Sequence, residues 1–163
     1  MSYLFKSRPQ VVERESYETM APQEKFTVSV LRHHIEHVLS NCAEPVSKNS
    51  RVLDVGCGRQ PFRKSLEELG YHYYSIDVQQ SPNESVDVIY EIDKQLPIEV
   101  LNLAPFDFIF CTEVMERVAD WETTFRNFSD LLSSKERLFI TCPHFYQLHE
   151  IPSDFWRSTP YAF

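Results

Sequence analysis

The segment RVLDVGCG at residues 51–58 limits the possible folds of this chain more than any other. A short apolar run with β-branched residues predicts a central strand covered on both faces, and the two glycines that follow predict a sharp turn. Phe62, Leu66 and Leu69 then recur at helical spacing. The segment therefore predicts a strand, a turn and a helix in that order, and it raises the question of which ligand the turn admits.

The same alternation continues along the rest of the chain. Apolar residues at helical spacing predict a helix up to about residue 40, ahead of the first strand. Four further strands are predicted at residues 71–78, 86–93, 106–112 and 137–142. Before the last of them, a long apolar helix face is formed by Val118, Trp121, Phe125, Phe128 and Leu132. This order predicts an α/β fold with a Rossmann-like, doubly wound and mostly parallel sheet, which looks truncated after its fifth strand.

The size of the chain fits a single domain. With 163 residues, of which 42% are hydrophobic, it can bury one good core. No internal repeat, low-complexity tract or linker marks a boundary. We expect an N-terminal cap at about residues 1–45, a ligand-binding core at about residues 46–145, and a tail rich in aromatic residues and histidine at residues 143–163.

Charge and cysteine content exclude several kinds of partner. The formal net charge is −8 and no run of Lys and Arg offsets it, so we expect no nucleic-acid partner. The 4 cysteines form no C-x-x-C pair and no secretory signal precedes them, which disfavours disulfides and structural zinc and favours a cytoplasmic location. No apolar stretch is long enough to cross a bilayer, so we expect no membrane partner.

The residues after the glycines decide between nucleotide ligands. A dinucleotide site uses G-x-G-x-x-G, but the third glycine position here is Pro61. A P-loop needs Gly-Lys followed by Ser or Thr, and none is present. With both phosphate-binding motifs excluded, the sequence favours a ligand that approaches the turn closely but carries no phosphate there. Asp54 fits a ligand that carries an amine. S-adenosylmethionine meets these requirements.

Two motifs carry a resemblance to a known family. VLDVGCG, followed by SIDV at the end of the next strand, resembles the S-adenosylmethionine-binding core of class I methyltransferases. FDFIFCTEVMERV at residues 106–118 is similar to a segment of bacterial small-molecule members that often reads close to E-V-L-E-H-V, with Arg117 here in place of His. The resemblance covers roughly residues 25–145. It implies the sheet order 3-2-1-4-5-7-6, of which the last two strands would be missing, and methyl transfer to the oxygen or nitrogen of a small molecule such as a sugar or natural product.

The resemblance assigns roles around the glycine turn. Gly56 and Gly58, with Cys57 between them, would leave room for the cofactor where a Cβ would collide with it. Asp54 would receive the methionine ammonium group, directly or through water. A simple tight turn and a helix-capping aspartate are the structural alternatives for these positions.

Acidic residues at the next strand ends extend the predicted cofactor site. Asp77 lies about 20 residues beyond the glycines, the separation at which a carboxylate reaches the ribose hydroxyls in this topology. Val78 follows it and is included in the predicted cofactor-binding set. Asp93 is predicted to end the third strand and contact the adenine amine, and Asp87 and Glu91 compete for this role.

The remaining predicted site residues lie nearer the C-terminus. Cys111, Thr112 and Glu113 end the fourth strand, where a substrate would meet the sulfonium methyl group. In the tail, His144 or His149 is the predicted general base for a hydroxyl acceptor. The alternatives are an aromatic lid packed on the core and, less favoured, a metal site, because the spacing is not that of a helical ligand pair.

A second class of function competes with the enzyme. An exposed sheet edge after the fifth strand invites pairing with another chain. The alternative is a non-catalytic, methyltransferase-like binding or oligomerisation module, with a homo-oligomer formed through that edge.

Overall fold

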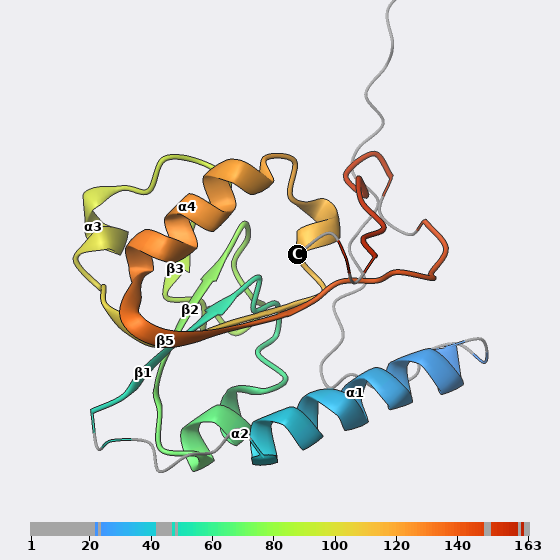
Figure 1. Ribbon diagram of the computed structural model, residues 1–163, viewed down its shortest axis with the longest axis horizontal. Coiled ribbons are helices and arrows are strands. Elements are labelled where there is room, and N and C mark those ends of the chain that lie inside the picture. The colour runs from blue at the N-terminus through green and yellow to red at the C-terminus, as the bar shows by residue number, and fades with distance from the viewer. Residues whose placement is uncertain are drawn as a thin grey trace, which may run out of the picture.

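The fold is a single five-stranded parallel sheet with helices on both faces. The computed structural model describes residues 22, 24–41, 47, 49–148, 151–159 and 161 (Figure 1). Every neighbouring pair of strands is parallel, in the order β3-β2-β1-β4-β5. The strands are β1 (Arg51–Val55), β2 (His72–Asp77), β3 (Val88–Ile89), β4 (Phe106–Thr112) and β5 (Leu132–Thr141). The predicted fold class is confirmed, and the order agrees with the first five strands that the family resemblance implied.

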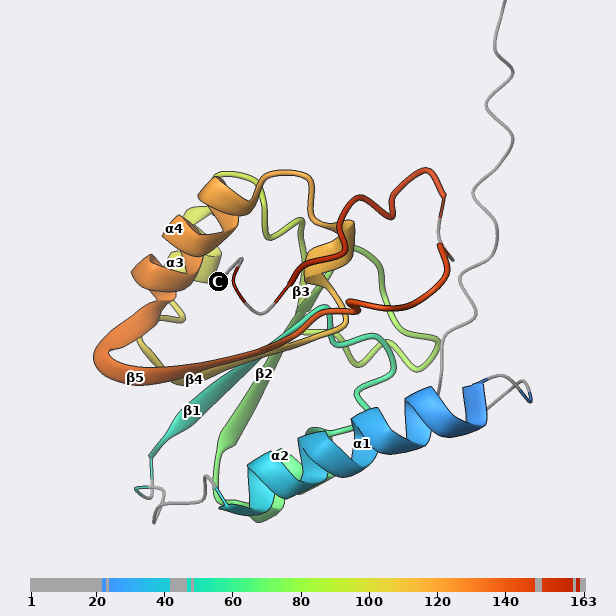
Figure 2. The ribbon, with the colours of Figure 1, turned by 45° about the vertical axis from the view of Figure 1, so that its right-hand side comes forward.

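The helices divide into two layers. They are α1 (Glu24–Asn41), α2 (Arg63–Glu68), α3 (Ile98–Leu101) and α4 (Trp121–Leu131), with a short 3-10 helix η1 (Met115–Arg117). In two views, α1 and α2 cover one face of the sheet and α3 and α4 cover the other (Figure 1 and Figure 2). No helix in the described part of the chain is long and apolar enough to cross a membrane.

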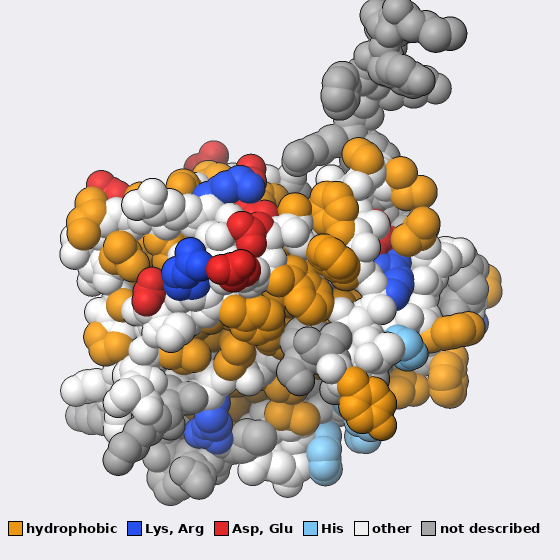
Figure 3. All heavy atoms as spheres, turned by 45° about the horizontal axis from the view of Figure 1, so that its top comes forward, with side chains coloured by type: hydrophobic (Ala, Val, Ile, Leu, Met, Phe, Trp, Pro, Cys, Tyr) orange, Lys and Arg blue, Asp and Glu red, His pale blue; other side chains and the backbone are white. Residues whose placement is uncertain are grey.

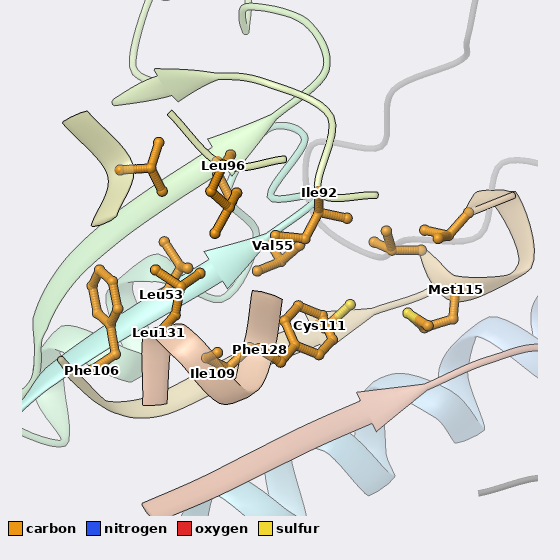
Figure 4. Close-up of a cluster of buried hydrophobic side chains, with 14 residues drawn as sticks. Leu53, Val55, Ile92, Leu96, Phe106, Ile109, Cys111, Met115, Phe128 and Leu131 are labelled. Atoms are coloured by element: carbon orange, nitrogen blue, oxygen red, sulfur yellow. The ribbon is translucent and has the colours of Figure 1, made fainter. Parts of the chain in front are cut away.

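The alternation of side chains along β1 builds one hydrophobic cluster on each face. Val52 packs into the cluster beneath α1 and α2, which also holds Ile35 and Leu66. Leu53 and Val55 point the other way, into the cluster shown in Figure 4. Because side chains of a strand alternate between faces, a central strand needs apolar residues at successive positions. This requirement explains why β1 has the bounds that the sequence predicted.

The third strand is much shorter than the predicted segment 86–93. It pairs with β2 only at Val88 and Ile89. Beyond it, the buried side chain of Asn127 on α4 donates hydrogen bonds to the carbonyls of Ile92 (2.7 Å) and Lys94 (2.8 Å). These two bonds hold the chain against α4 and away from the sheet, so the strand prediction was wrong here.

The segment between β4 and β5 also differs from its prediction. The long helix face from Val118 to Leu132 is divided, because Asp120 accepts a hydrogen bond from the Thr123 N–H at 3.0 Å and begins α4 at Trp121. Leu132 already has extended backbone dihedral angles and begins β5, five residues before the predicted strand start. Within the described residues, β5 pairs with β4 alone and forms an edge of the sheet.

Replacement of Asn127 by Ala should destabilise the protein. It would leave the buried Ile92 carbonyl without its donor, at a cost of about 1–3 kcal/mol, and the loss at the exposed residue Lys94 should be smaller because water can replace that bond. Chemical denaturation measures the loss of unfolding free energy. Asn102→Ala, at the exposed end of α3, is the control and should change stability little. Equal effects of the two substitutions would contradict a specific role for the Asn127 bonds.

Candidate functional site

The glycine turn lies at the carboxyl end of β1. Gly56 and Gly58 have φ of 67° and 51°, in the left-handed region that side chains with a Cβ rarely adopt. A Cβ on Gly56 would lie 2.2 Å from Cγ2 of Val114, whereas a Cβ on Gly58 would meet nothing within 4 Å. A Cβ at Gly56 would therefore collide within the protein itself, and its collision with a cofactor stays a prediction. The space beside Gly58 remains open.

Asp77 at the end of β2 holds this turn in place. Its Oδ2 accepts a hydrogen bond from the Gly58 N–H at 2.8 Å, and its Oδ1 accepts one from the Gln79 N–H at 3.1 Å. A carboxylate offers about four acceptor positions, so two bonds leave capacity on each oxygen. Val78 is 57% exposed beside it. The structure thus brings Gly58, Asp77 and Val78 together at one edge of the sheet.

Asp54 lies beneath this edge and is only 3% exposed. Its Oδ2 accepts a hydrogen bond of 2.6 Å from the Tyr73 hydroxyl. Burial raises the pKa of Asp54 to about 7, the hydrogen bond from Tyr73 opposes this change, and the charge of Asp77 adds to it. Asp54 and Asp77 therefore act electrostatically on one another, and together they give this edge a negative potential.

The thiols of two predicted cofactor-site residues, Cys57 and Cys111, are buried, and their cofactor contacts stay predictions. Cys57 is 3% exposed and Cys111 is completely buried. Burial is the main cause that raises the pKa of both thiols, and the charge of Asp54 is the next. Both side chains therefore belong to the protein interior. Thr112 and Glu113, the next residues after Cys111, are half-buried, and Glu113 has a φ of 55°.

Asp93 lies beyond the third strand instead of ending it, because the chain leaves the sheet after Ile89. Its side chain is 10% exposed, and its Oδ1 is 3.1 Å from Nζ of Lys94. The competing Asp87 is engaged elsewhere, since its Oδ2 accepts hydrogen bonds from the N–H (2.9 Å) and hydroxyl (2.7 Å) of Ser75. The adenine contact of Asp93 stays a prediction.

The tail after β5 returns to the carboxyl end of β4. Arg157 pairs with Asp154 through two hydrogen bonds and donates to the carbonyls of Tyr146 and Gln147. His144 is exposed in the turn after β5, and His149 lies outside the described residues. Neither predicted base is tested by these contacts.

Sequence reasoning missed Glu116, which lies in η1 and is completely buried. Neither of its carboxylate oxygens has a hydrogen-bond partner among the described residues. Burial raises its pKa to about 7, the charge of Glu113 adds to this change and Arg117 opposes it. The signal in the sequence was the second acidic residue of EVMERV.

Gly56→Ala should cost more stability than Gly58→Ala. Both substitutions place a Cβ at positive φ, which costs roughly 1–2 kcal/mol. Only the change at Gly56 also drives a methyl group into Val114, for which overpacking adds about 1–3 kcal/mol. Chemical denaturation of the two variants compares them directly, and an equal loss would contradict the packing argument.

The raised pKa of Asp54 predicts a pH-dependent stability. Since the folded state keeps this proton up to about pH 7, the free energy of unfolding falls as the pH rises from the ordinary pKa of 3.8 to about 7. Asp54→Asn removes this titration. The unfolding free energy of the variant minus that of the parent should therefore rise by on the order of 2–3 kcal/mol between pH 5 and pH 8.

Denaturation curves at the two pH values measure this difference. Tyr73→Phe is the matched variant, because it removes the hydrogen bond that favours the ionised form and should destabilise more at pH 8 than at pH 5. A constant difference between Asp54→Asn and the parent would contradict the assignment.

The chain matches known proteins over most of its length. A family model described as a methyltransferase domain matches residues 31–159. A ubiquinone biosynthesis O-methyltransferase of Xanthomonas axonopodis pv. citri is 29% identical over an alignment of 101 positions, which covers 56% of this chain and 42% of that relative. A second such enzyme, from Xylella fastidiosa, is 31% identical over an alignment of 101 positions, which covers 56% of this chain and 41% of the relative. The chain therefore spans about two fifths of the length of these curated relatives.

A solved structure extends the likeness to the fold. The S-adenosylmethionine-dependent methyltransferase of Archaeoglobus fulgidus superposes with a TM-score of 0.55 at 21% identity, over 86% of this chain and 67% of that one. The resemblance drawn from VLDVGCG and EVMERV is confirmed by the family match. Because that match covers well over half of its residues, the chain belongs to the methyltransferase domain family.

Proposed function

We propose that the chain binds S-adenosylmethionine at the carboxyl ends of β1 and β2 and directs its methyl group to a small-molecule acceptor. The observation that carries the proposal is Asp77. Its carboxylate is fixed by the Gly58 N–H and retains acceptor capacity beside the open space at Gly58. Two adjacent ribose hydroxyls match such an acceptor.

The charges of this edge also fit the cofactor. S-adenosylmethionine carries positive charge on its sulfonium and ammonium groups, and Asp54 and Asp77 supply negative charge. Oδ1 of Asp54 accepts no hydrogen bond from the described residues and is the proposed contact for the ammonium group, directly or through water. Val78 would pack against the adenine, and Asp93 would contact its amine.

The chemical demand on the protein is modest. The cofactor, when bound, supplies a methyl group that is already activated by the positive sulfur. Alignment of the reacting atoms by the protein provides about 7–11 kcal/mol through proximity and orientation. The ubiquinone biosynthesis relatives, which are O-methyltransferases, support a small-molecule acceptor. The proposed cofactor site is compatible with an oxygen or a nitrogen as the atom that receives the methyl group. The roles of His144 and His149 as proton acceptors stay predictions.

Calorimetric titration tests the cofactor assignment. S-adenosylhomocysteine should bind, and NAD should not bind comparably, because Pro61 replaces the glycine that a pyrophosphate site requires. Absence of S-adenosylhomocysteine binding at millimolar concentration would contradict the proposal.

Asp77→Ala should lower cofactor affinity by at least about tenfold. The two lost charge-assisted hydrogen bonds are worth roughly 1.5–3 kcal/mol each before water compensates. The substitution also removes the acceptor of the Gly58 N–H, so some stability should be lost as well. Calorimetry on the folded variant separates the two effects.

Asp107→Ala is the matched control for this experiment. Asp107 also accepts a backbone hydrogen bond, from the Arg51 N–H at 2.7 Å, but at the opposite end of β1. It should lose stability and keep its cofactor affinity. Equal affinities of the Asp77 and Asp107 variants would remove the ribose contact from the proposal.

A second candidate function is an oligomerisation module. The observation that favours it is the edge strand β5, which pairs with β4 alone in the described part of the chain. Native mass spectrometry at micromolar concentration tests it. A dimer without cofactor binding would favour this candidate over the enzyme.

A further inference from the structure

The carboxylate of Glu116 is buried without the hydrogen bonds that a buried charge requires. Its side chain is 1% exposed, and neither oxygen accepts a hydrogen bond from the described residues. The cation nearest along its own helix is Arg117, whose Nε is 3.9 Å from Oε1, beyond hydrogen-bond distance. Buried polar groups in proteins are otherwise almost always satisfied, so this carboxylate is a position at which a water, an ion or a ligand group can bind.

The tail is hydrogen-bonded to the backbone of Glu116. The backbone carbonyl of Glu116 accepts hydrogen bonds from the N–H groups of Phe155 (2.7 Å) and Trp156 (3.2 Å). The indole N–H of Trp156 donates to the Val118 carbonyl at 2.8 Å. The side chains of Phe155 and Trp156 remain 49% and 44% exposed. Figure 3 shows that hydrophobic side chains are open to solvent on one face of the molecule.

Glu116 also lies next to the proposed cofactor edge. Val114, two residues earlier, occupies the position that a Cβ on Gly56 would need. Burial raises the pKa of the Cys111 thiol, and the charges of Asp54 and Glu116 add to this change, so both carboxylates act on the carboxyl end of β4. Glu116 therefore lies on the β4 side of the edge at which the methyl group would be presented.

We propose that Glu116 is the proton acceptor for a hydroxyl-bearing acceptor molecule whose apolar body rests against Phe155 and Trp156. This inference rests on the proposed function and deepens it by naming the acceptor class and the catalytic residue. An acceptor hydroxyl would donate the hydrogen bond that the described residues do not supply. Because the side chain of Glu116 is 1% exposed, an acceptor reaches its carboxylate only when the packing around it opens.

The transfer step balances with Glu116 as the base. The acceptor O–H bond breaks, and its proton moves to a carboxylate oxygen of Glu116. An electron pair of the acceptor oxygen forms the new bond to the methyl carbon. The electron pair of the broken carbon–sulfur bond returns to sulfur, which becomes a neutral thioether, and Glu116 later releases its proton to water.

The proton affinity of Glu116 suits this role. Burial raises its pKa to about 7, with Glu113 adding to the effect and Arg117 opposing it. A base of this pKa is ionised for part of the time at neutral pH and accepts a proton readily. Ionisable groups of several segments act electrostatically with Glu116. Glu113 and Arg117 lie near it in its own segment, and Cys111 lies in β4. Cys142 follows β5, and Asp154 and Arg157 lie in the tail.

Binding of phenol to the protein saturated with S-adenosylhomocysteine tests the inference without turnover. Phenol has a hydroxyl pKa near 10, as tyrosine does, and is neutral at both pH 6 and pH 8. If its hydroxyl donates to ionised Glu116, calorimetry should show binding about tenfold tighter at pH 8 than at pH 6. Glu116→Gln should abolish this gradient, and Glu116→Asp, which keeps a carboxylate, should retain it.

Activity measurements complete the experiment. Glu116→Gln should lower kcat for methylation of phenol by about 10²–10⁴-fold, while the affinity for S-adenosylhomocysteine stays at the parent value. Glu99→Gln, an exposed carboxylate on α3, is the control and should match the parent. If Glu116→Gln fails to fold, the change in phenol affinity between pH 6 and pH 8, measured for the parent and for Glu116→Asp, tests the inference instead.

The outcomes separate this inference from the proposed function. A parent that binds S-adenosylhomocysteine but shows no pH gradient for phenol, or a Glu116→Gln variant that keeps the gradient, would overturn the role of Glu116 alone. Binding of benzylamine with no binding of phenol would assign the site to an amine and overturn the hydroxyl class. A parent that does not bind S-adenosylhomocysteine would overturn the proposed function and this inference with it.

Discussion

The turn at the carboxyl end of β1 is the constraint on which the candidate site depends. Gly56 must lack a Cβ because Val114 fills the adjacent space, and Gly58 is held by the carboxylate of Asp77. One turn therefore ties β1 to the ends of both neighbouring strands, β2 and β4. The same contacts that fix the fold also place an anionic acceptor beside an open space, and the proposed ribose contact depends on this arrangement.

The sequence predicted the central strands well because their residues experience the same environment throughout. β1 and β4 have the predicted bounds, since nearly every side chain along them is buried. The ends of β3 and β5 depend on contacts between distant segments instead. Asn127 draws the residues after Ile89 toward α4, and no local pattern encodes that hydrogen bond. Elements governed by local periodicity were predictable, and those governed by a tertiary polar contact were not.

The residues of the candidate site also differ in how well the sequence predicted their location. Asp77 could be predicted because the end of a parallel strand fixes where its side chain lies, and the structure adds that this carboxylate also braces Gly58. Cys111 was placed at the substrate edge by its position in the strand, but its side chain faces the interior. Glu116 was missed because its importance lies in burial without a hydrogen bond, a property that only tertiary packing creates.

The most direct test of the central claim is a crystal structure of the chain with S-adenosylhomocysteine. We expect the ligand to lie across the carboxyl ends of β1 and β2, with its ribose hydroxyls on Asp77 and its adenosine passing the open side of Gly58. A ligand bound elsewhere on the sheet, or bound at this edge with no contact to Asp77, would contradict it.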